Sequence, residues 1–94
     1  MLNAEKIAAV RGYLTAEFPD CAVEDWYEAG RDAQSFRILT GQSHHLATIS
    51  RNFLEGRDVS EIAPILKSFL LAEHLRDLGT VRVLVGEEGL NLEG

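Results

Sequence analysis

The chain has 94 residues, of which 46% are hydrophobic and 26% charged, a composition typical of one small soluble domain. Fifteen acidic residues against nine basic ones give a net charge of −6. No apolar run approaches the roughly 20 residues needed to cross a bilayer, and the first residues lack the pattern of a secretory signal. The single cysteine, Cys21, can form neither an internal disulfide nor a thiol-zinc site. We therefore expect one domain, residues 1–94, in the cytoplasm, without a membrane partner or a cofactor.

A helix is predicted over residues 3–18. Apolar residues recur at spacings of three and four from Ile7 to Phe18, which places them on one face of a helix. Asn3 is suited to accept a hydrogen bond from a free backbone N–H of the first turn. Pro19 disfavours helical geometry at the residue before it and so predicts the end of the helix.

Three short strands are predicted after this helix. They contain β-branched and aromatic residues or alternate apolar with polar ones, and glycine-containing turns separate them: Cys21–Glu28, Ser35–Thr40 and His45–Phe53. Short turns favour antiparallel neighbours, so we expect a three-stranded meander. The alternation in the first strand is imperfect and leaves open whether Trp26 or Tyr27 faces the core.

A second helix is predicted over residues 58–78. Asp58, with Glu61 three residues later, resembles a capping box. Pro64 lies too deep for the first helical position, which predicts an irregular first turn or a later start. Gly79 supplies a left-handed stop.

The last predicted strand is Thr80–Val85, with its three valines on one face. Residues 86–94 are expected either to hang free as a flexible tail or to fold back as a short hairpin. The predicted fold class is α+β, a two-layer sandwich of order α-β-β-β-α-β with a short fifth strand if the tail folds back. Its sheet is mostly antiparallel and carries both helices on one face, which is the simplest way to bury both apolar stripes.

The second predicted helix has apolar residues on two sides. On one continuous helix they form two stripes: Ile62, Ile65, Leu66, Phe69 and Ala72 on one side, and Leu71, Leu75 and Leu78 on the other. The second stripe is either covered by the first helix or the tail, or it contacts a partner. We predict a subunit interface there, with a two-fold homodimer as the favoured form. A second candidate interface, on the outer face of the sheet, consists of Leu39, Leu46 and Leu84.

Charge is distributed unevenly along the chain. Residues 1–30 carry six acids and two bases, residues 31–57 two acids and four arginines, and residues 58–94 seven acids and three bases. The middle segment is therefore a cationic band, and its candidates for contacting an anion or an acidic peptide are Arg37, Arg51, His44 and His45. The alternative interpretation is that these charges protect strand edges and pair with nearby acids.

No catalytic or metal site is predicted. His44 and His45 are neighbours on a strand and point to opposite faces, so they cannot readily share one metal ion. Acidic residues near Cys21 disfavour a reactive thiolate. The pair Glu87-Glu88 lies in a turn, which does not hold two carboxylates at the fixed separation that glycoside chemistry requires.

The predicted element order resembles two kinds of protein. The α-β-β-β-α order is similar to that of double-stranded-RNA-binding domains and to that of acidic dimeric secretion chaperones. The net charge of −6 opposes the first, because nucleic-acid affinity comes largely from neutralising phosphates. We predict a non-enzymatic interaction module, homodimeric, that binds a protein or peptide. The alternative is a nucleic-acid-binding domain that uses the strands around Arg37 and Arg51.

Overall fold

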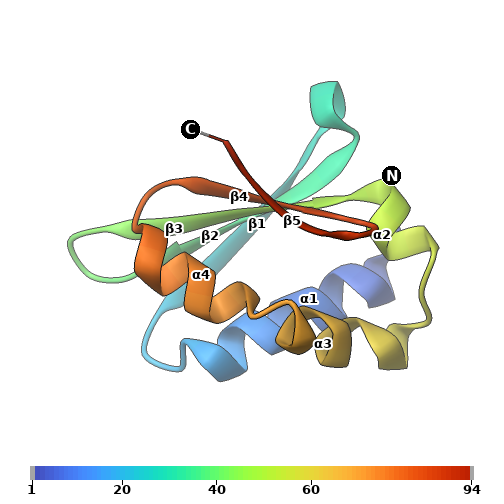
Figure 1. Cartoon of the computed structure of the whole chain (residues 1–94). Helices are drawn as coiled ribbons and strands as arrows, with labels where there is room; N and C mark the ends of the chain where they lie inside the picture. The colour runs from blue at the N-terminus through green and yellow to red at the C-terminus, as the bar shows by residue number, and fades with distance from the viewer. Residues whose placement is uncertain (1, 94) are drawn as a thin grey trace.

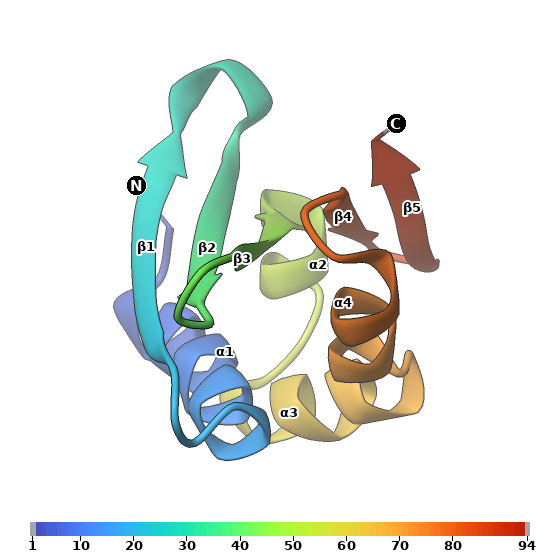
Figure 2. The same cartoon turned by 90° about the vertical axis from the view of Figure 1, so that its left-hand side faces the viewer.

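The computed structural model describes residues 2–93, which form a five-stranded sheet with all of the α-helices on one face (Figures 1 and 2). The elements in chain order are α1 (Ala4–Glu17), β1 (Ala22–Glu28), the 3-10 turn η1 (Ala29–Arg31), β2 (Ala33–Leu39), β3 (His44–Ser50), α2 (Arg51–Glu55), α3 (Val59–Ser68), α4 (Leu71–Leu78), β4 (Arg82–Gly86) and β5 (Gly89–Glu93). The α+β class and the two-layer arrangement predicted from the sequence are confirmed. No helix within residues 2–93 has the length and apolar character needed to span a membrane.

The strands lie side by side in chain order, β1-β2-β3-β4-β5. The predicted meander β1-β2-β3 is antiparallel, with Phe36 opposite Ala47 and Asp25 opposite Phe36. Strand β4 pairs parallel to β3, because the three helices between them return the chain to the same end of the sheet. The tail folds back as β5 and pairs antiparallel to β4, which confirms the hairpin alternative.

The third strand ends three residues before its predicted end. Ser50 accepts a hydrogen bond from the backbone N–H of Phe53 and so caps α2, a short helix that the sequence pattern did not predict. Phe53 and Leu54 are fully buried against the sheet. The apolar run was interpreted as strand because short buried helices and strands have similar composition.

The second predicted helix is broken in two. Its start is confirmed, because Asp58 and Glu61 form the capping box and α3 begins directly after it. The irregular or late start expected from Pro64 is wrong, since α3 runs through that residue. The break lies at Leu70, which adopts left-handed geometry with φ of 59° and separates α3 from α4.

The core lies between the helices and the inner face of the sheet. Val10 and Leu14 of α1 pack with Phe36, Ile38, Ala47, Ile49, Val83 and Val85 of the sheet and with the buried residues of α2, α3 and α4. Neither aromatic residue of β1 joins this core: Trp26 lies on the outer face beneath Arg37, and Tyr27 lies at the hairpin end with its hydroxyl on Asp32. The strands also twist strongly, so the C-terminal end of β5 points away from the helical layer in Figure 2.

Candidate functional site

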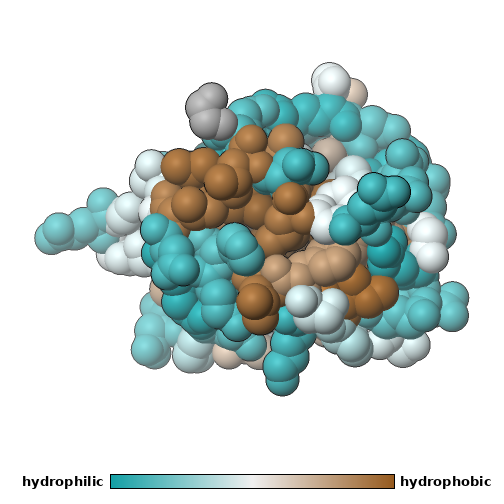
Figure 3. Space-filling view, viewed as in Figure 1, coloured by the Kyte–Doolittle hydropathy of each residue, from teal (hydrophilic) through white to brown (hydrophobic). Residues whose placement is uncertain are grey.

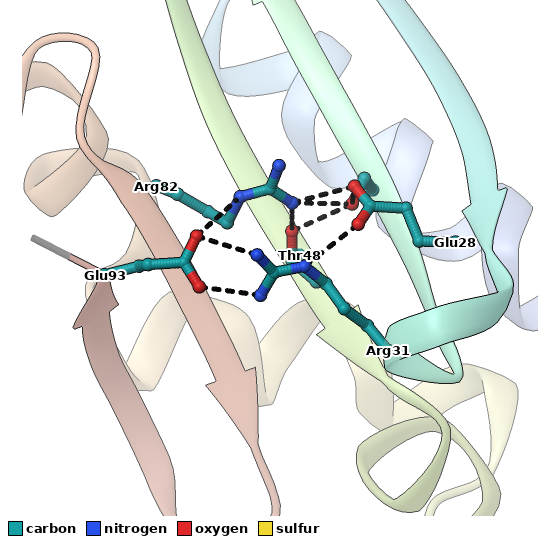
Figure 4. Close-up of polar contacts among 6 residues, drawn as sticks. Glu28, Arg31, Thr48, Arg82 and Glu93 are labelled. Carbon is teal, nitrogen blue, oxygen red and sulfur yellow. Dashed lines mark hydrogen bonds and ion pairs between the residues drawn. The ribbon is translucent and has the colours of Figure 1, made fainter.

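The outer face of the sheet carries a polar cluster at its centre, although no helix covers it. Ser35 of β2 and Thr48 of β3 lie opposite each other on this face and are nonetheless buried, with their hydroxyl oxygens 2.8 Å apart. Charged side chains from the β1–β2 hairpin and from the β4–β5 hairpin lie over them (Figure 4). We call this group the outer-face ionic cluster; it consists of Glu28, Arg31, Ser35, Thr48, Arg82 and Glu93.

Arg82 is the central member of the cluster. Its Nη1 donates to Glu28 Oε1 at 2.8 Å and to Thr48 Oγ1 at 2.6 Å, and its Nε lies 3.3 Å from Glu93 Oε1. Arg31 joins the same two carboxylates, with Nε 3.0 Å from Glu28 Oε2 and Nη1 2.8 Å from Glu93 Oε2. The cluster thereby ties the β1–β2 hairpin to β4 and β5.

The titration of these groups follows from their contacts. Hydrogen bonds from Ser35 and Arg82 lower the pKa of Glu28 below its usual value. The hydrogen bond from Arg31 lowers the pKa of Glu93, and the same contact raises the pKa of Arg31. Two carboxylates and two guanidinium groups therefore stay ionised and balance one another. A carboxylate whose pKa is lowered in this way is a weaker base, and the arrangement is typical of structural polar contacts.

The cationic band predicted from the sequence does not form one positive surface. Arg51 makes two 2.8 Å hydrogen bonds from Nε to the carboxylate of Asp32, which lower the pKa of Asp32 and raise that of Arg51. Arg37 lies on the outer face, 5.2 Å from the centre of the Trp26 ring and 3.9 Å from Glu24. These pairs agree with the alternative interpretation, in which the arginines pair with nearby acids.

The two neighbouring histidines point to opposite faces of β3, as predicted. His45 is on the inner face, where its Nδ1 lies 2.8 Å from the carbonyl oxygen of Gly79 and its ring 5.5 Å from that of Phe18. A carbonyl oxygen only accepts, so Nδ1 carries the proton. His44 lies on the outer face, opposite Leu39. The structure therefore does not bring His44 and His45 together with Arg37 and Arg51 into one site.

The first candidate interface is not exposed as predicted. Leu71 and Leu75 are fully buried, and Leu78 is half-buried. The break at Leu70 rotates α4 relative to α3, so both apolar stripes face the core instead of opposite sides. The second candidate group, Leu39, Leu46 and Leu84, lies half-buried on the outer face of the sheet, and an interface there stays a prediction.

A different apolar surface lies along β5. The two leucines of this strand, Leu90 and Leu92, face the same side as the core residues Val85 and Val83. Leu90 is half-buried and packs against the core, whereas Leu92 is largely exposed. Leu92 is 53% exposed and Leu70, at the start of α4, is 49% exposed. Figure 3 shows hydrophobic side chains gathered over β4 and β5, with smaller apolar areas over the helices below. We call Leu90 and Leu92 the β5 apolar face.

The sequence pattern does not predict this surface, because residues 86–94 suit both a hairpin and a free tail. The available signal is the alternation Leu90-Asn91-Leu92 directly after the turn Gly86-Glu87-Glu88-Gly89. Such alternation predicts a strand with one apolar face. What it does not show is whether a helix covers that face.

A hollow of about 550 Å³ lies between α1 and α3, where Ala9, Tyr13, Ala63 and Pro64 line it, and two others lie beside β5. One, of about 320 Å³, is on the outer face between Arg31, Thr48, Leu84 and Asn91, and a second, of about 700 Å³, lies at the β4–β5 turn. Within residues 2–93, no three His, Cys, Asp or Glu side chains are grouped as metal ligands would be.

No family model matches the chain, and no curated protein and no solved structure is significantly similar to it. Its function is therefore argued from its own surfaces. The two that stand out are the outer-face ionic cluster, whose charges satisfy one another, and the β5 apolar face, where Leu92 is largely exposed.

Proposed function

We propose that this domain is a non-enzymatic interaction module that binds polypeptide, a second copy of itself included, through the β5 apolar face. The observation that carries the proposal is the exposure of Leu92, at 53%, on an open edge strand of the sheet. Contiguous apolar surface on a small domain marks an interaction site more often than it marks ordinary surface. An open strand edge adds unpaired backbone donors and acceptors, which an extended peptide satisfies.

The polar groups of the domain support a binding role over a catalytic one. Glu28 and Glu93 are held ionised by arginines, and Asp32 is held by Arg51 and Tyr27. The single half-buried thiol, Cys21, suits a reducing compartment such as the cytoplasm. Nucleic-acid binding gains no support, because Arg31 and Arg51 already pair with carboxylates and phosphate contact requires free cations.

The proposal is tested with an array of immobilised short peptides that span a range of hydrophobicity. We expect the wild-type protein to bind a subset with alternating apolar residues, and Leu92→Ser to lower that signal by about tenfold, equivalent to about 1.4 kcal/mol. The matched control is Val59→Ser, which removes an apolar side chain that is 39% exposed at the start of α3. Equal signals from all three proteins, or no binding by any of them, would overturn the proposal.

A further inference from the structure

We infer that the occupant of the β5 edge is a second copy of this chain, paired antiparallel about a two-fold axis at Asn91. The inference rests on the proposed function and names its partner. It follows from a difference between the two edges of the sheet, from the hydrogen-bonding alternation along β5, and from the placement of charge.

The β1 edge is blocked within the chain. Arg11 of α1 donates from Nη1 to the carbonyl oxygen of Val23 at 2.7 Å, and its other nitrogen pairs with Asp25. The strand also carries Glu24 and Glu28. A side chain bonded to the edge and a row of acidic residues are two of the ways in which proteins prevent edge-to-edge pairing. Two copies of β1 side by side would bring like charges opposite each other.

The β5 edge has neither protection. Its sequence from Gly89 to Leu92 contains no charge and no proline. Within residues 2–93, no side chain bonds to the backbone of Leu90 or Leu92. The edge is therefore open to another strand.

The backbone of β5 presents the right groups at this edge. Gly86 pairs with Gly89 across the two-residue turn, and such a pair exchanges hydrogen bonds within the hairpin. Because the pattern alternates along an antiparallel ladder, Asn91 also bonds to β4. Leu90 and Leu92 then direct their N–H and C=O groups away from β4, toward the empty side.

Two copies of β5 are complementary when Asn91 lies opposite Asn91 of the second copy. Leu90 then lies opposite Leu92 of the second copy, and each of these two pairs exchanges two backbone hydrogen bonds. The four leucines meet on one face of the joined sheet and extend the β5 apolar face across the axis. The two asparagines face each other on the opposite side. An interface with one patch repeated on both subunits is what a two-fold dimer requires.

Charge does not oppose this arrangement. Glu93, the one charged residue of β5, lies opposite Gly89 of the second copy in the proposed register. Its carboxylate already contacts Arg31 and Arg82 of its own chain. No unpaired like charges meet at the axis, in contrast to the β1 edge.

The register is tested by cross-linking. In a Cys21→Ser background, Asn91→Cys places two thiols at a non-hydrogen-bonded pair, where Cα atoms are about 4.5 Å apart and a disulfide fits. We expect oxidised glutathione to convert this variant to a covalent dimer. The matched control, Glu24→Cys in the same background, places the thiol on the β1 edge and is expected to stay monomeric.

The association itself is measured by sedimentation equilibrium up to high micromolar concentration. We expect the uncross-linked wild type to approach twice the monomer mass of 10.4 kDa. Leu92→Lys is expected to weaken the dimer by at least about tenfold, because lysine on a strand edge opposes pairing. Glu24→Lys is expected to leave the wild-type association unchanged.

Two results would overturn the inference. One is a monomeric mass throughout, with Asn91→Cys cross-linking no faster than Glu24→Cys. The other is a dimer that Leu92→Lys does not weaken. In either case, loss of peptide-array binding in Leu92→Ser would still support the proposed function, so the two failures are distinguishable.

Discussion

At the scale of single residues, the hydroxyl of Tyr13 connects α1 to the start of α4. The oxygen of Tyr13, on α1, accepts a hydrogen bond from the backbone N–H of Ala72 at 3.0 Å. Ala72 lies in the first turn of α4, where backbone N–H groups have no partner within the helix, and Leu70 provides no side-chain cap. Burial raises the pKa of Tyr13, so its hydroxyl stays protonated over the ordinary pH range. Tyr13 thus caps a helix nearly sixty residues away.

We predict that Tyr13→Phe lowers the free energy of unfolding by about 1–3 kcal/mol, because it leaves the buried N–H of Ala72 without a partner. Urea unfolding followed by circular dichroism measures the change. Tyr27→Phe is the matched control, since its hydroxyl bonds to Asp32 at the exposed hairpin tip. If the two variants lose equal stability, the capping role of Tyr13 is wrong.

At the scale of elements, the break between α3 and α4 decides which leucines are buried. Leu70 adopts φ of 59°, a conformation that costs a residue with a Cβ atom about 1–2 kcal/mol. The break turns the second apolar stripe toward the sheet, so Leu71 and Leu75 become fully buried. Burying two leucines stabilises the fold by more than the strained residue costs.

We predict opposite outcomes for two substitutions around this break. Leu70→Gly relieves the left-handed strain and is expected to leave the free energy of unfolding unchanged or to raise it by up to about 1 kcal/mol. Leu75→Ala removes a buried side chain and is expected to lower it by about 2–5 kcal/mol. If α3 and α4 formed one continuous helix with Leu75 exposed, the two effects would be reversed. Leu70→Gly would then lower the free energy of unfolding by about 1 kcal/mol, and Leu75→Ala would change it little. Urea midpoints of the two variants decide between these structures.

At the scale of the whole molecule, the outer-face ionic cluster makes stability depend on pH. The pKa values of Glu28 and Glu93 are lower in the folded chain than the usual value of 4.5. Between the folded and the unfolded values the unfolded chain binds more protons, so stability falls as the pH falls. The stabilisation from these two carboxylates is fully present above their pKa in the unfolded chain. It is lost as the pH drops through their pKa in the folded chain.

We predict that the free energy of unfolding is nearly constant near neutral pH and decreases below about pH 5. Glu28→Gln is expected to have a lower free energy of unfolding than the wild type at pH 7. That free energy is expected to fall less on acidification, because one of the two carboxylates with a lowered pKa is absent. Glu88→Gln is the control, since the described residues offer its carboxylate no ion pair. Parallel pH profiles for Glu28→Gln and the wild type would contradict the structural role of the cluster.

Much of the fold was predictable because its signals are local. Asn3 caps α1, Asp58 and Glu61 form their box at the start of α3, and Gly79 adopts positive φ after α4, as their residue types indicate. The three-stranded meander follows from short turns between alternating segments. Each of these features depends on residues within about four positions of one another.

The remaining features depend on contacts between distant segments. The short helix α2 forms where Phe53 and Leu54 meet the sheet, and the strained Leu70 persists because Leu71 and Leu75 pack beneath it. The pairing of Glu28 with Arg82 joins residues 54 positions apart. No local sequence pattern predicts such contacts, because the distant residues meet and stabilise each other only once the sheet has formed.

The sequence by itself determined the class of the fold and the order of its main elements. Its share of hydrophobic residues, 46%, is enough to form the core of a small two-layer domain. It also determined that the arginines of the middle segment have acids to pair with. Only the tertiary structure decided which apolar surface stays open: Leu71 and Leu75 of α4 turn inward at the break, while Leu92 of β5 stays exposed. The physical reason is that exposure depends on what covers a residue, and covering elements come from elsewhere in the chain.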